Sequence, residues 1–332
     1  MKVLVIGGAG YIGSAVIQLL WQQGCDVTVL DLLLFGGESL IPLMGKERFR
    51  LIHGDLRDER LLNQVVPQHD AVCLLAAIVG EPACNHDPEN AVATNLDGAR
   101  KVMNVAKAVG VERFVFASTC SNYGVSSQDE LVTENAPLQP LSTYSETKVA
   151  AEQSLLEMTD AKFHPTVLRF STAFGISSRM RFDLMVSDFT LAAVRDQRLV
   201  VFGEQFWRPF VHVRDIAQAV DRVLAADPEM VSGEVFNVGD NTSNHQKVEL
   251  ANMVQQHVDG TELEFVKRDQ DPRSYRVDFS KIKDRLGFEA EWSVEDGIAE
   301  LHTALKAGMW HNPSQPQFYN HLCSPTLVSA TP

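Results

Sequence analysis

Several features that would direct the interpretation elsewhere are scarce or missing in this sequence. Its 332 residues include five cysteines, an odd number without regular spacing, which argues against a disulfide framework or a zinc site. The longest apolar run, residues 71–80, is too short to span a membrane. Lysine and arginine total 29 against 43 acidic residues, and the net charge of −14 argues against a nucleic-acid binder. The N-terminus enters a strand at once and does not look like a signal peptide, so we expect a soluble, cytoplasmic protein. We also expect no metal site.

The sequence does contain a regular alternation of strand-like and helix-like stretches. Amphipathic stretches such as 14–24 and 90–110 separate short β-branched runs at 2–7, 26–31, 49–55, 71–77, 113–118 and 165–170. Strands without in/out alternation, separated by helices, indicate a parallel sheet covered on both faces. We therefore expect an α/β fold with a doubly wound, Rossmann-like parallel sheet.

The alternation loosens after residue 175. Strand-like runs at 199–203, 234–239 and 263–267 then alternate with helix-like stretches at 215–226, 247–258 and 293–308. We expect residues 1–175 to form a first domain, and 176–310 mainly a smaller α/β region that lies over the ligand edge of the sheet and binds a substrate. Residues 311–332 are expected to be a weakly ordered tail.

Four glycines follow the first strand and precede a helix. They stand at positions 7, 8, 10 and 13, where missing side chains permit a tight turn, approach of a pyrophosphate and close helix–strand packing. Asp31 ends the second strand, where a carboxylate can accept hydrogen bonds from ribose hydroxyls and would repel a 2′-phosphate. The domain at 1–175 is therefore expected to bind NAD rather than NADP. Asp55, which ends the third strand, is either a helix N-cap or a contact to the adenine amino group.

A Tyr/Lys pair lies at the start of the helix expected from about residue 142. Thr143 and Glu146 fit a capping box, and Tyr144 and Lys148 share one helix face because they are four residues apart. A neighbouring ammonium and an oxidised nicotinamide would both lower the pKa of a tyrosine, which is ordinarily about 10. Tyr144 could then accept a hydroxyl proton while hydride leaves the same carbon. A surface Tyr/Lys pair is the alternative, but the dinucleotide motif and the hydroxyl-rich strand end at Thr119 favour catalysis.

With these motifs the chain resembles an extended short-chain dehydrogenase/reductase of the nucleotide-sugar epimerase/dehydratase family. The similarity runs from residue 2 to about residue 308. It rests on GGAGYIG, Asp31, GDL at 54–56, TNLDG at 94–98, STCSNYG at 118–124, YxxxK, LRF, RPFVHVRD at 208–215 and RSYRVD at 273–278. These motifs are specific for the superfamily and much less so for one reaction.

The resemblance implies a role for each matching position. Thr119 would hydrogen-bond the reacting hydroxyl, Tyr144 would transfer its proton, and Lys148 would hold the nicotinamide ribose. Family members commonly form homodimers through the two helices that we place at about 88–109 and 143–158. The implied cofactor-binding residues are Gly7, Gly10, Tyr11, Ile12, Gly13, Asp31, Asp55, Leu56, Ala76, Ala77, Asn95, Tyr144, Lys148, Phe170 and Ser171. The substrate-binding candidates are Thr119, Thr172, Arg181, Arg208, Arg268 and Arg273, where the arginines at 208 and 268 either clamp a diphosphate or form surface salt bridges.

The chain departs from the family where the chemistry is decided. In the 4,6-dehydratases of the family the residues after the catalytic threonine are usually Asp and Glu, and here Cys120 and Ser121 take their places. A thiol can donate a proton but a serine cannot readily remove one from carbon, so Cys120 is either an acid or a small packing residue. Glu81 is the best candidate for a missing acid/base, with a solvated loop carboxylate as the alternative. Arg179 and Arg181 could read a phosphate or a carboxylate.

We therefore expect an NAD-dependent enzyme that oxidises a ring hydroxyl of a nucleotide sugar, most simply at C4. Return of the hydride to the other face is 4-epimerisation, which needs no further acid or base. The alternative is dehydration, or epimerisation at C3 or C5, using Cys120 and Glu81. Two other classes stay open, a simple dehydrogenase that releases NADH and a non-catalytic NAD-binding module, and the Tyr/Lys pair argues against the second.

Overall fold

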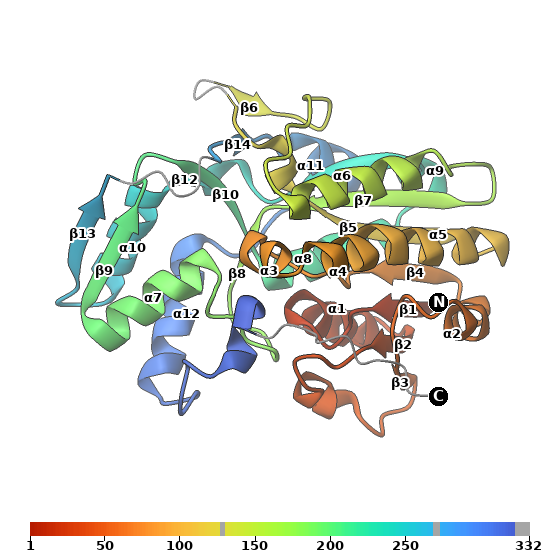
Figure 1. Cartoon of the computed structure of the whole chain (residues 1–332), viewed down its shortest axis with the longest axis horizontal. Coiled ribbons are helices and arrows are strands. Elements are labelled where there is room, and N and C mark those ends of the chain that lie inside the picture. Colours follow the sequence, from red (N-terminus) through yellow and green to blue (C-terminus); the bar gives the residue numbers. More distant parts are fainter. Residues whose placement is uncertain (127–129, 268–272, 323–332) are drawn as a thin grey trace.

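The computed structural model describes residues 1–126, 130–267 and 273–322. Its largest element is a parallel sheet in the order β11-β7-β5-β4-β1-β2-β3 (Figure 1). This arrangement confirms the predicted doubly wound α/β fold. Its strands are β1 (Lys2–Ile6), β2 (Asp26–Asp31), β3 (Phe49–His53), β4 (Ala71–Leu74), β5 (Arg113–Thr119), β7 (His164–Phe170) and β11 (Glu234–Val238).

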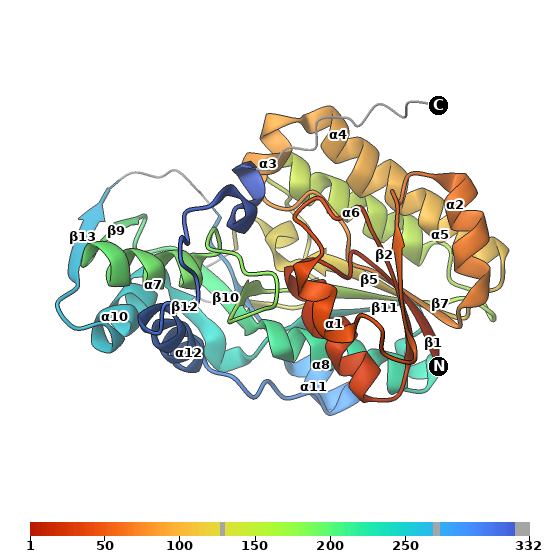
Figure 2. The same cartoon turned by 90° about the horizontal axis from the view of Figure 1, so that it is seen from below.

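Helices cover both faces of this sheet because its strands alternate between two apolar cores. Val3 and Val5 of β1 belong to the core under α1 (Tyr11–Gln22) and α8 (Val213–Ala225). Leu4 and Ile6 belong to the opposite core, under α5 (Ala99–Ala108) and α6 (Thr143–Leu156). The same side carries α2 (Glu59–Val65), α3 (Glu81–His86), α4 (Pro88–Val92) and the π-helical segment Ala93–Gly98, as Figure 2 shows. Burial on both faces explains the uninterrupted apolar strand sequences.

A smaller lobe lies beside the carboxyl edge of the large sheet (Figures 1 and 2). Three short sheets belong to it. They are formed by β8 (Thr172–Phe174), β10 (Trp207–His212) and β12 (Asn244–Gln246), by β9 (Arg198–Phe202) and β13 (Glu262–Val266), and by β6 (Leu131–Val132) and β14 (Arg276–Val277). Its helices include α7 (Met185–Asp196), α10 (Lys247–His257) and α12 (Val294–Lys306). The chain passes between the two lobes several times after residue 175. It returns to the large lobe for α8, α9 (Pro228–Val231), β11 and α11 (Ser280–Leu286).

The helix that carries the Tyr/Lys pair is capped differently from the prediction. Ser142 is the N-cap of α6, and its hydroxyl accepts a hydrogen bond from the backbone N–H of Ser145 at 3.3 Å. The Ser145 hydroxyl accepts the backbone N–H of Ser142 at 3.2 Å and completes a capping box. The box predicted for Thr143 and Glu146 was therefore wrong by one residue, because a serine at N3 can replace the usual glutamate.

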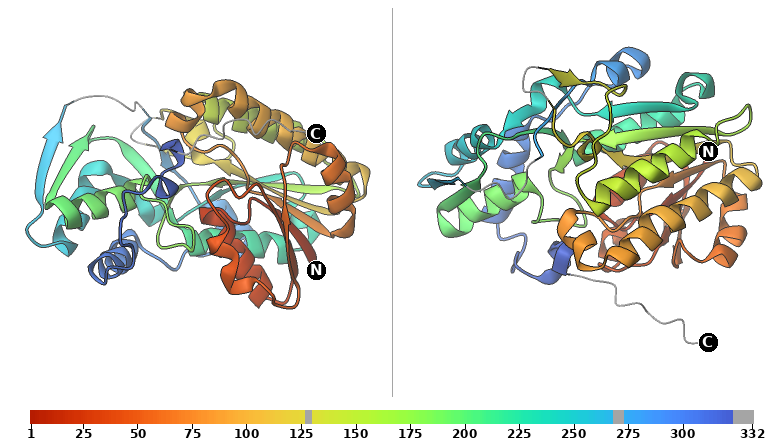
Figure 3. Two further views of the ribbon diagram at one scale, coloured as in Figure 1. Left: turned by 60° about the horizontal axis from the view of Figure 1, so that its bottom comes forward. Right: turned by 45° about the horizontal axis from the view of Figure 1, so that its top comes forward.

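Beyond residue 310 the chain makes defined contacts as far as residue 322. Two short 3-10 segments, Pro316–Phe318 and Asn320–Leu322, follow α12. The ring of Phe318 packs edge-on against the ring of Phe182, with 5.5 Å between their centroids. This apolar contact attaches a segment whose sequence is otherwise mostly polar. Figure 3 shows it between the small lobe and the helices that follow β4. None of the helices in the described ranges is long and apolar enough to cross a bilayer, and no metal-binding group of three His, Cys, Asp or Glu side chains occurs there.

Candidate active site

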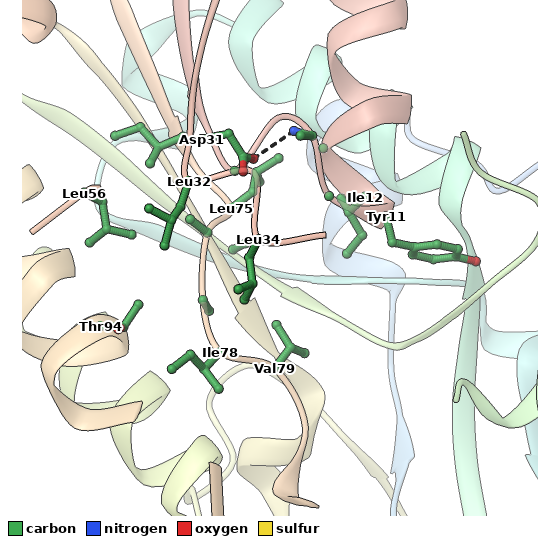
Figure 4. A pocket seen from close by; sticks show the side chains of 18 of the residues that line it. Tyr11, Ile12, Asp31, Leu32, Leu34, Leu56, Leu75, Ile78, Val79 and Thr94 are labelled. Atoms are coloured by element: carbon green, nitrogen blue, oxygen red, sulfur yellow. Dashed lines mark hydrogen bonds between the residues drawn. The ribbon is translucent and has the colours of Figure 1, made fainter. Parts of the chain in front are cut away.

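A cleft of about 220 Å³ opens at the carboxyl ends of β1, β2 and β4, where the strand order of the sheet reverses. Its walls come from the glycine loop, the segments after β2, β3 and β4, and the start of α6. Figure 4 shows Asp31 beside the glycine loop, with Leu56, Ile78 and Val79 around the other side of the cleft. Most of the predicted cofactor residues line it, namely Gly7, Gly10, Tyr11, Ile12, Gly13, Asp31, Asp55, Leu56, Ala76, Ala77, Tyr144, Lys148 and Phe170.

The glycine loop fits the pyrophosphate of a dinucleotide. Gly7 has a φ of 93°, and a Cβ on it would lie 2.6 Å from the backbone nitrogen of Ala76. A Cβ on Gly13 would lie 2.1 Å from the carbonyl oxygen of Gly7, so both positions need glycine for packing. Gly10 has open space apart from the carbonyl of Gly7 at 3.3 Å. Since α1 begins directly after it, with no side-chain cap and no acidic residue in its first turn, the helix N-terminus remains available to phosphate.

Asp31 and Asp55 both line the cleft, but their pKa values are shifted in opposite directions. Asp31 accepts hydrogen bonds from the backbone N–H groups of Ala9 and Leu33 at 2.9 and 2.8 Å, and burial raises its pKa despite them. Asp55 is paired with Arg57 at 2.6 Å. Burial alone would raise the pKa of Asp55, but hydrogen bonds and charge from Arg57 lower it overall. The N-cap alternative for Asp55 was wrong, because Asp58 caps α2.

Three predicted cofactor residues act on the backbone around the cleft. The Asn95 amide accepts the N–H of Ile78 at 2.8 Å and donates to its carbonyl at 2.9 Å, which fixes the loop after β4. The Ser171 hydroxyl donates to the carbonyl of Val238 at 2.9 Å. Tyr11 lines the cleft, but its hydroxyl donates to the carbonyl of Gly175 at 2.6 Å, and Figure 4 shows its ring turned away from the leucines. Asn95 and Ser171 are outside the cleft lining and hold the backbone of its walls.

Tyr144 and Lys148 both reach the cleft from α6. The Lys148 ammonium donates to the carbonyl of Ala117 at 2.8 Å, and burial lowers its pKa to about 8. The pKa of Tyr144 is raised by burial, while the positive charges of Arg181 and Arg273 act in the opposite direction. Desolvation of the phenol thus outweighs the neighbouring cations of the protein itself, and the lowering expected from Lys148 together with an oxidised nicotinamide stays a prediction.

Thr119 and Cys120 at the end of β5 are both buried and both lie outside the residues that line the cleft. Thr119 is buried, and its hydroxyl oxygen accepts the backbone N–H of Ser121 at 3.1 Å. The Cys120 thiol points into the core and donates to the carbonyl of Arg169 at 3.2 Å. Burial raises the pKa of Cys120 to about 12. Glu81 begins α3 as a half-buried residue and does not line the cleft. These positions favour the packing role for Cys120 and place Glu81 outside the cleft lining.

The predicted substrate arginines lie in two places. Arg181 lines the cofactor cleft and pairs with Asp183 at 2.9 Å. Arg208 donates to the carbonyl oxygens of Trp207 and Arg273, and Arg273 donates to the hydroxyl of Ser121 at 3.5 Å. The structure thus places Arg208 and Arg273 next to the residue that follows Cys120. We call Arg208 and Arg273 the second arginine cluster. Thr172 is half-buried in β8, which pairs with β10, the strand that carries Arg208. Arg268 lies outside the described residues.

Sequence reasoning missed a buried ion pair behind the Tyr/Lys pair. Glu152 of α6 is paired with Arg169 of β7, and both side chains are at most 5% exposed. Ser118 donates to Glu152 at 2.8 Å, while Arg169 donates to the hydroxyl of Tyr123 at 2.8 Å, which donates to Asn237 at 2.7 Å. This network joins α6 to β5 and thereby fixes the Tyr/Lys helix relative to Thr119. A glutamate four residues after Lys148 on a sheet-facing helix was the available signal.

A dinucleotide cleft with a Tyr/Lys pair at the carboxyl edge of a parallel sheet defines a nicotinamide-dependent enzyme. The chain belongs to the NAD dependent epimerase/dehydratase family, which it matches over residues 3–239. It is 32% identical, over 90% of its own length and 96% of the relative's, to the low-salt glycan biosynthesis protein Agl12 of Haloferax volcanii.

Two solved structures show the same fold over nearly the whole chain. One is a UDP-glucose 4-epimerase of Thermotoga maritima with UDP-glucose, at 26% identity and a TM-score of 0.83, covering 93% of this chain and 100% of that one. The other is a dTDP-glucose 4,6-dehydratase of Streptomyces venezuelae with NAD bound, also at 26% identity and a TM-score of 0.83, covering 95% and 100%. The protein is thus an NAD-dependent enzyme of this family.

Proposed function

We propose that this protein is a nucleotide-sugar 4-epimerase that oxidises C4 and returns the hydride to the opposite face of the ring. The observation that carries the proposal is the placement of Cys120, whose thiol is fully buried and donates to the carbonyl of Arg169. With Ser121 as the next residue, no carboxylate follows Thr119. A 4,6-elimination needs an acid at the 6-hydroxyl and a base at C5, whereas 4-epimerisation needs neither.

The cleft residues divide the work of the first step. NAD, when bound, supplies the hydride acceptor and a positive charge. Tyr144 accepts the proton of the C4 hydroxyl, and Arg181 and Arg273 favour its phenolate against the effect of burial. Thr119 aligns the same hydroxyl, and Lys148, held by the carbonyl of Ala117, binds the nicotinamide ribose. The same phenol returns the proton when the hydride comes back.

The second arginine cluster suits the diphosphate of the substrate. Arg208 and Arg273 lie beside Ser121 and the hydroxyl of Tyr275, which donates to Ser121 at 3.4 Å. Guanidinium groups bind phosphate oxygens in pairs, and Arg208 is oriented by two backbone carbonyls. We propose this cluster, with Thr172 and Arg268, as the anchor for a nucleoside diphosphate, and residues 176–310 as mainly the substrate-binding region.

The exposed helices of the large lobe suit a homodimer of the kind common in the family. Val92 at the end of α4 is 37% exposed, and Leu141 just before α6 is 47% exposed. Both apolar side chains lie at the two helices expected to pair, so a second copy would cover them. We propose a cytoplasmic homodimer, whose oligomeric state sedimentation analysis would test.

Incubation with UDP-, GDP-, CDP- and dTDP-sugars in deuterated water tests the reaction. The 4-epimerase proposal predicts inversion at C4 by NMR, no change of mass and no NADH release. A product lighter by one water, or deuterium at C5 or C3, would instead establish the dehydratase or C3/C5-epimerase alternative. NADH accumulation would establish a simple dehydrogenase.

A further inference from the structure

The segment at residues 313–322, here called the C-terminal strap, lies across the cofactor cleft. It contains the two 3-10 segments Pro316–Phe318 and Asn320–Leu322. Residues 320–322 contact α3, which follows the cleft loop after β4. Figure 3 shows the strap reaching these helices from the side of the small lobe. The strap thus connects the two sides of the cleft.

The strap is attached to the 179–183 segment that forms one wall. The backbone N–H of Phe182 donates to the carbonyl of Phe318 at 3.0 Å, and their rings pack edge-on at 5.5 Å. The backbone N–H of Asn320 donates to Asp183 at 2.9 Å, and Asp183 is itself paired with Arg181 of the cleft. These contacts hold the strap in one position.

Asn320 brings to the cleft a polar group that has no hydrogen-bond partner in the part of the chain that the structure describes. It is one of the residues that line the cleft. Its amide oxygen is buried, and no hydrogen-bond donor for it occurs among the described residues. A buried acceptor without a partner is destabilising, so such atoms usually mark a place where a ligand or a water completes the site. The ribose hydroxyls, the carboxamide and the adenine amino group of NAD are donors of the required kind.

The strap also orients Arg179, which lines the adenosine side of the cleft. The guanidinium of Arg179 donates to the carbonyl of Gln317 at 3.2 Å and stacks on the ring of Phe35 at 3.9 Å. Phe35 belongs to the segment after β2 and lines the same cleft. The strap therefore contacts the 179–183 wall and α3, and it is linked to Phe35 through Arg179.

We propose that the C-terminal strap retains NAD in its cleft and that Asn320 is a cofactor-binding residue. The strap must open before the dinucleotide can leave. NAD therefore dissociates slowly between turnovers, and binding of NAD in turn holds the strap closed.

The rate of NAD loss from the loaded protein tests this directly. Purified enzyme is saturated with NAD and desalted, and the NAD still bound is quantified over time. We expect Asn320→Ala to lose NAD roughly fivefold faster, which is the effect of one hydrogen bond. Phe318→Ala, which detaches the strap, is expected to lose it roughly tenfold faster or more. Gln315→Ala, an exposed position on the same segment, is the matched control and should keep the wild-type rate. A wild-type rate in Asn320→Ala overturns the contact, and a wild-type rate in both variants overturns the strap.

Limited proteolysis gives a readout that does not depend on a variant. Chymotrypsin cleavage of the wild type after Phe318 or Tyr319 should be slower when NAD is present. Equal cleavage of the wild type with and without NAD would contradict a strap that closes on the cofactor.

Discussion

Replacement of Lys148 by methionine should stabilise the cofactor-free protein while it abolishes catalysis. The Lys148 ammonium is buried against α6 and β5, with the carbonyl of Ala117 as its hydrogen-bond acceptor. The nearest ring, Phe116, lies 4.7 Å from its nitrogen. No carboxylate among the described residues forms an ion pair with it. The protein therefore holds an unpaired cation that is useful only when the dinucleotide and substrate are bound.

The size of the effect follows from the depressed pKa of Lys148. Burial lowers it from 10.5 to about 8, and each step of one in pKa corresponds to 1.36 kcal/mol, so the charged form costs about 3 kcal/mol. The lost hydrogen bond to Ala117 offsets about 1 kcal/mol of this. Lys148→Met should thus raise the free energy of unfolding by about 2 kcal/mol at pH 7.

The stabilisation expected for Lys148→Met depends on pH. Below pH 8 the lysine is protonated in both states, so the folded protein carries the full penalty. Between pH 8 and 10.5 the unfolded chain binds the proton and the folded protein does not, so the wild type becomes more stable as pH rises. The advantage of Lys148→Met should therefore be complete below pH 8 and vanish towards pH 10.5.

Urea unfolding of the cofactor-free proteins at pH 7 and pH 10 measures this difference. Lys46→Met, at an exposed lysine, is the control and should leave the stability unchanged at both pH values. If Lys148→Met were less stable than the wild type at pH 7, or equally shifted at both pH values, the reasoning from an unpaired buried ammonium would be refuted.

Three further substitutions test the site. Tyr144→Phe should lower kcat by roughly 10³-fold or more because the proton acceptor is lost, with NAD still bound in a mass measurement; an active variant would exclude the phenol. Cys120→Ala should turn over close to the wild-type rate in a product assay, and a severe loss with intact folding would restore the thiol as an acid. Glu152→Ala should lower the free energy of unfolding by about 3–5 kcal/mol, since Arg169 would remain buried without its carboxylate partner. Urea titration measures this loss, with Glu264→Ala, which breaks an exposed ion pair, as the control. A loss no larger than that of the control would contradict the prediction.

The parallel sheet and the cofactor cleft could be predicted because local sequence determines them. Apolar strands separated by amphipathic helices allow few arrangements, and the glycines at 7 and 13 stand where the structure leaves no room for side chains. The spacing of Tyr144 and Lys148 on one helix was enough to bring both to the same cleft. In each case residues close in sequence carry the information.

The features that escaped prediction depend on contacts between distant segments. The direction of the Cys120 thiol is set by β7, about fifty residues later. The raised pKa of Tyr144 depends on burial by several elements, which a count of neighbouring charges does not include. Asn320 joins the cleft through Asp183, 137 residues before it, in a polar stretch that resembles a loose tail. The partner of Glu152 was likewise hidden on another strand.

A nucleotide sugar that carries deuterium at C4 provides the most direct test of internal hydride return. The account predicts that the product is inverted at C4 and keeps the label there, with none in solvent or in released NADH. Transfer of the label to C6, as a 4,6-dehydratase requires, or its appearance in free cofactor would contradict the account.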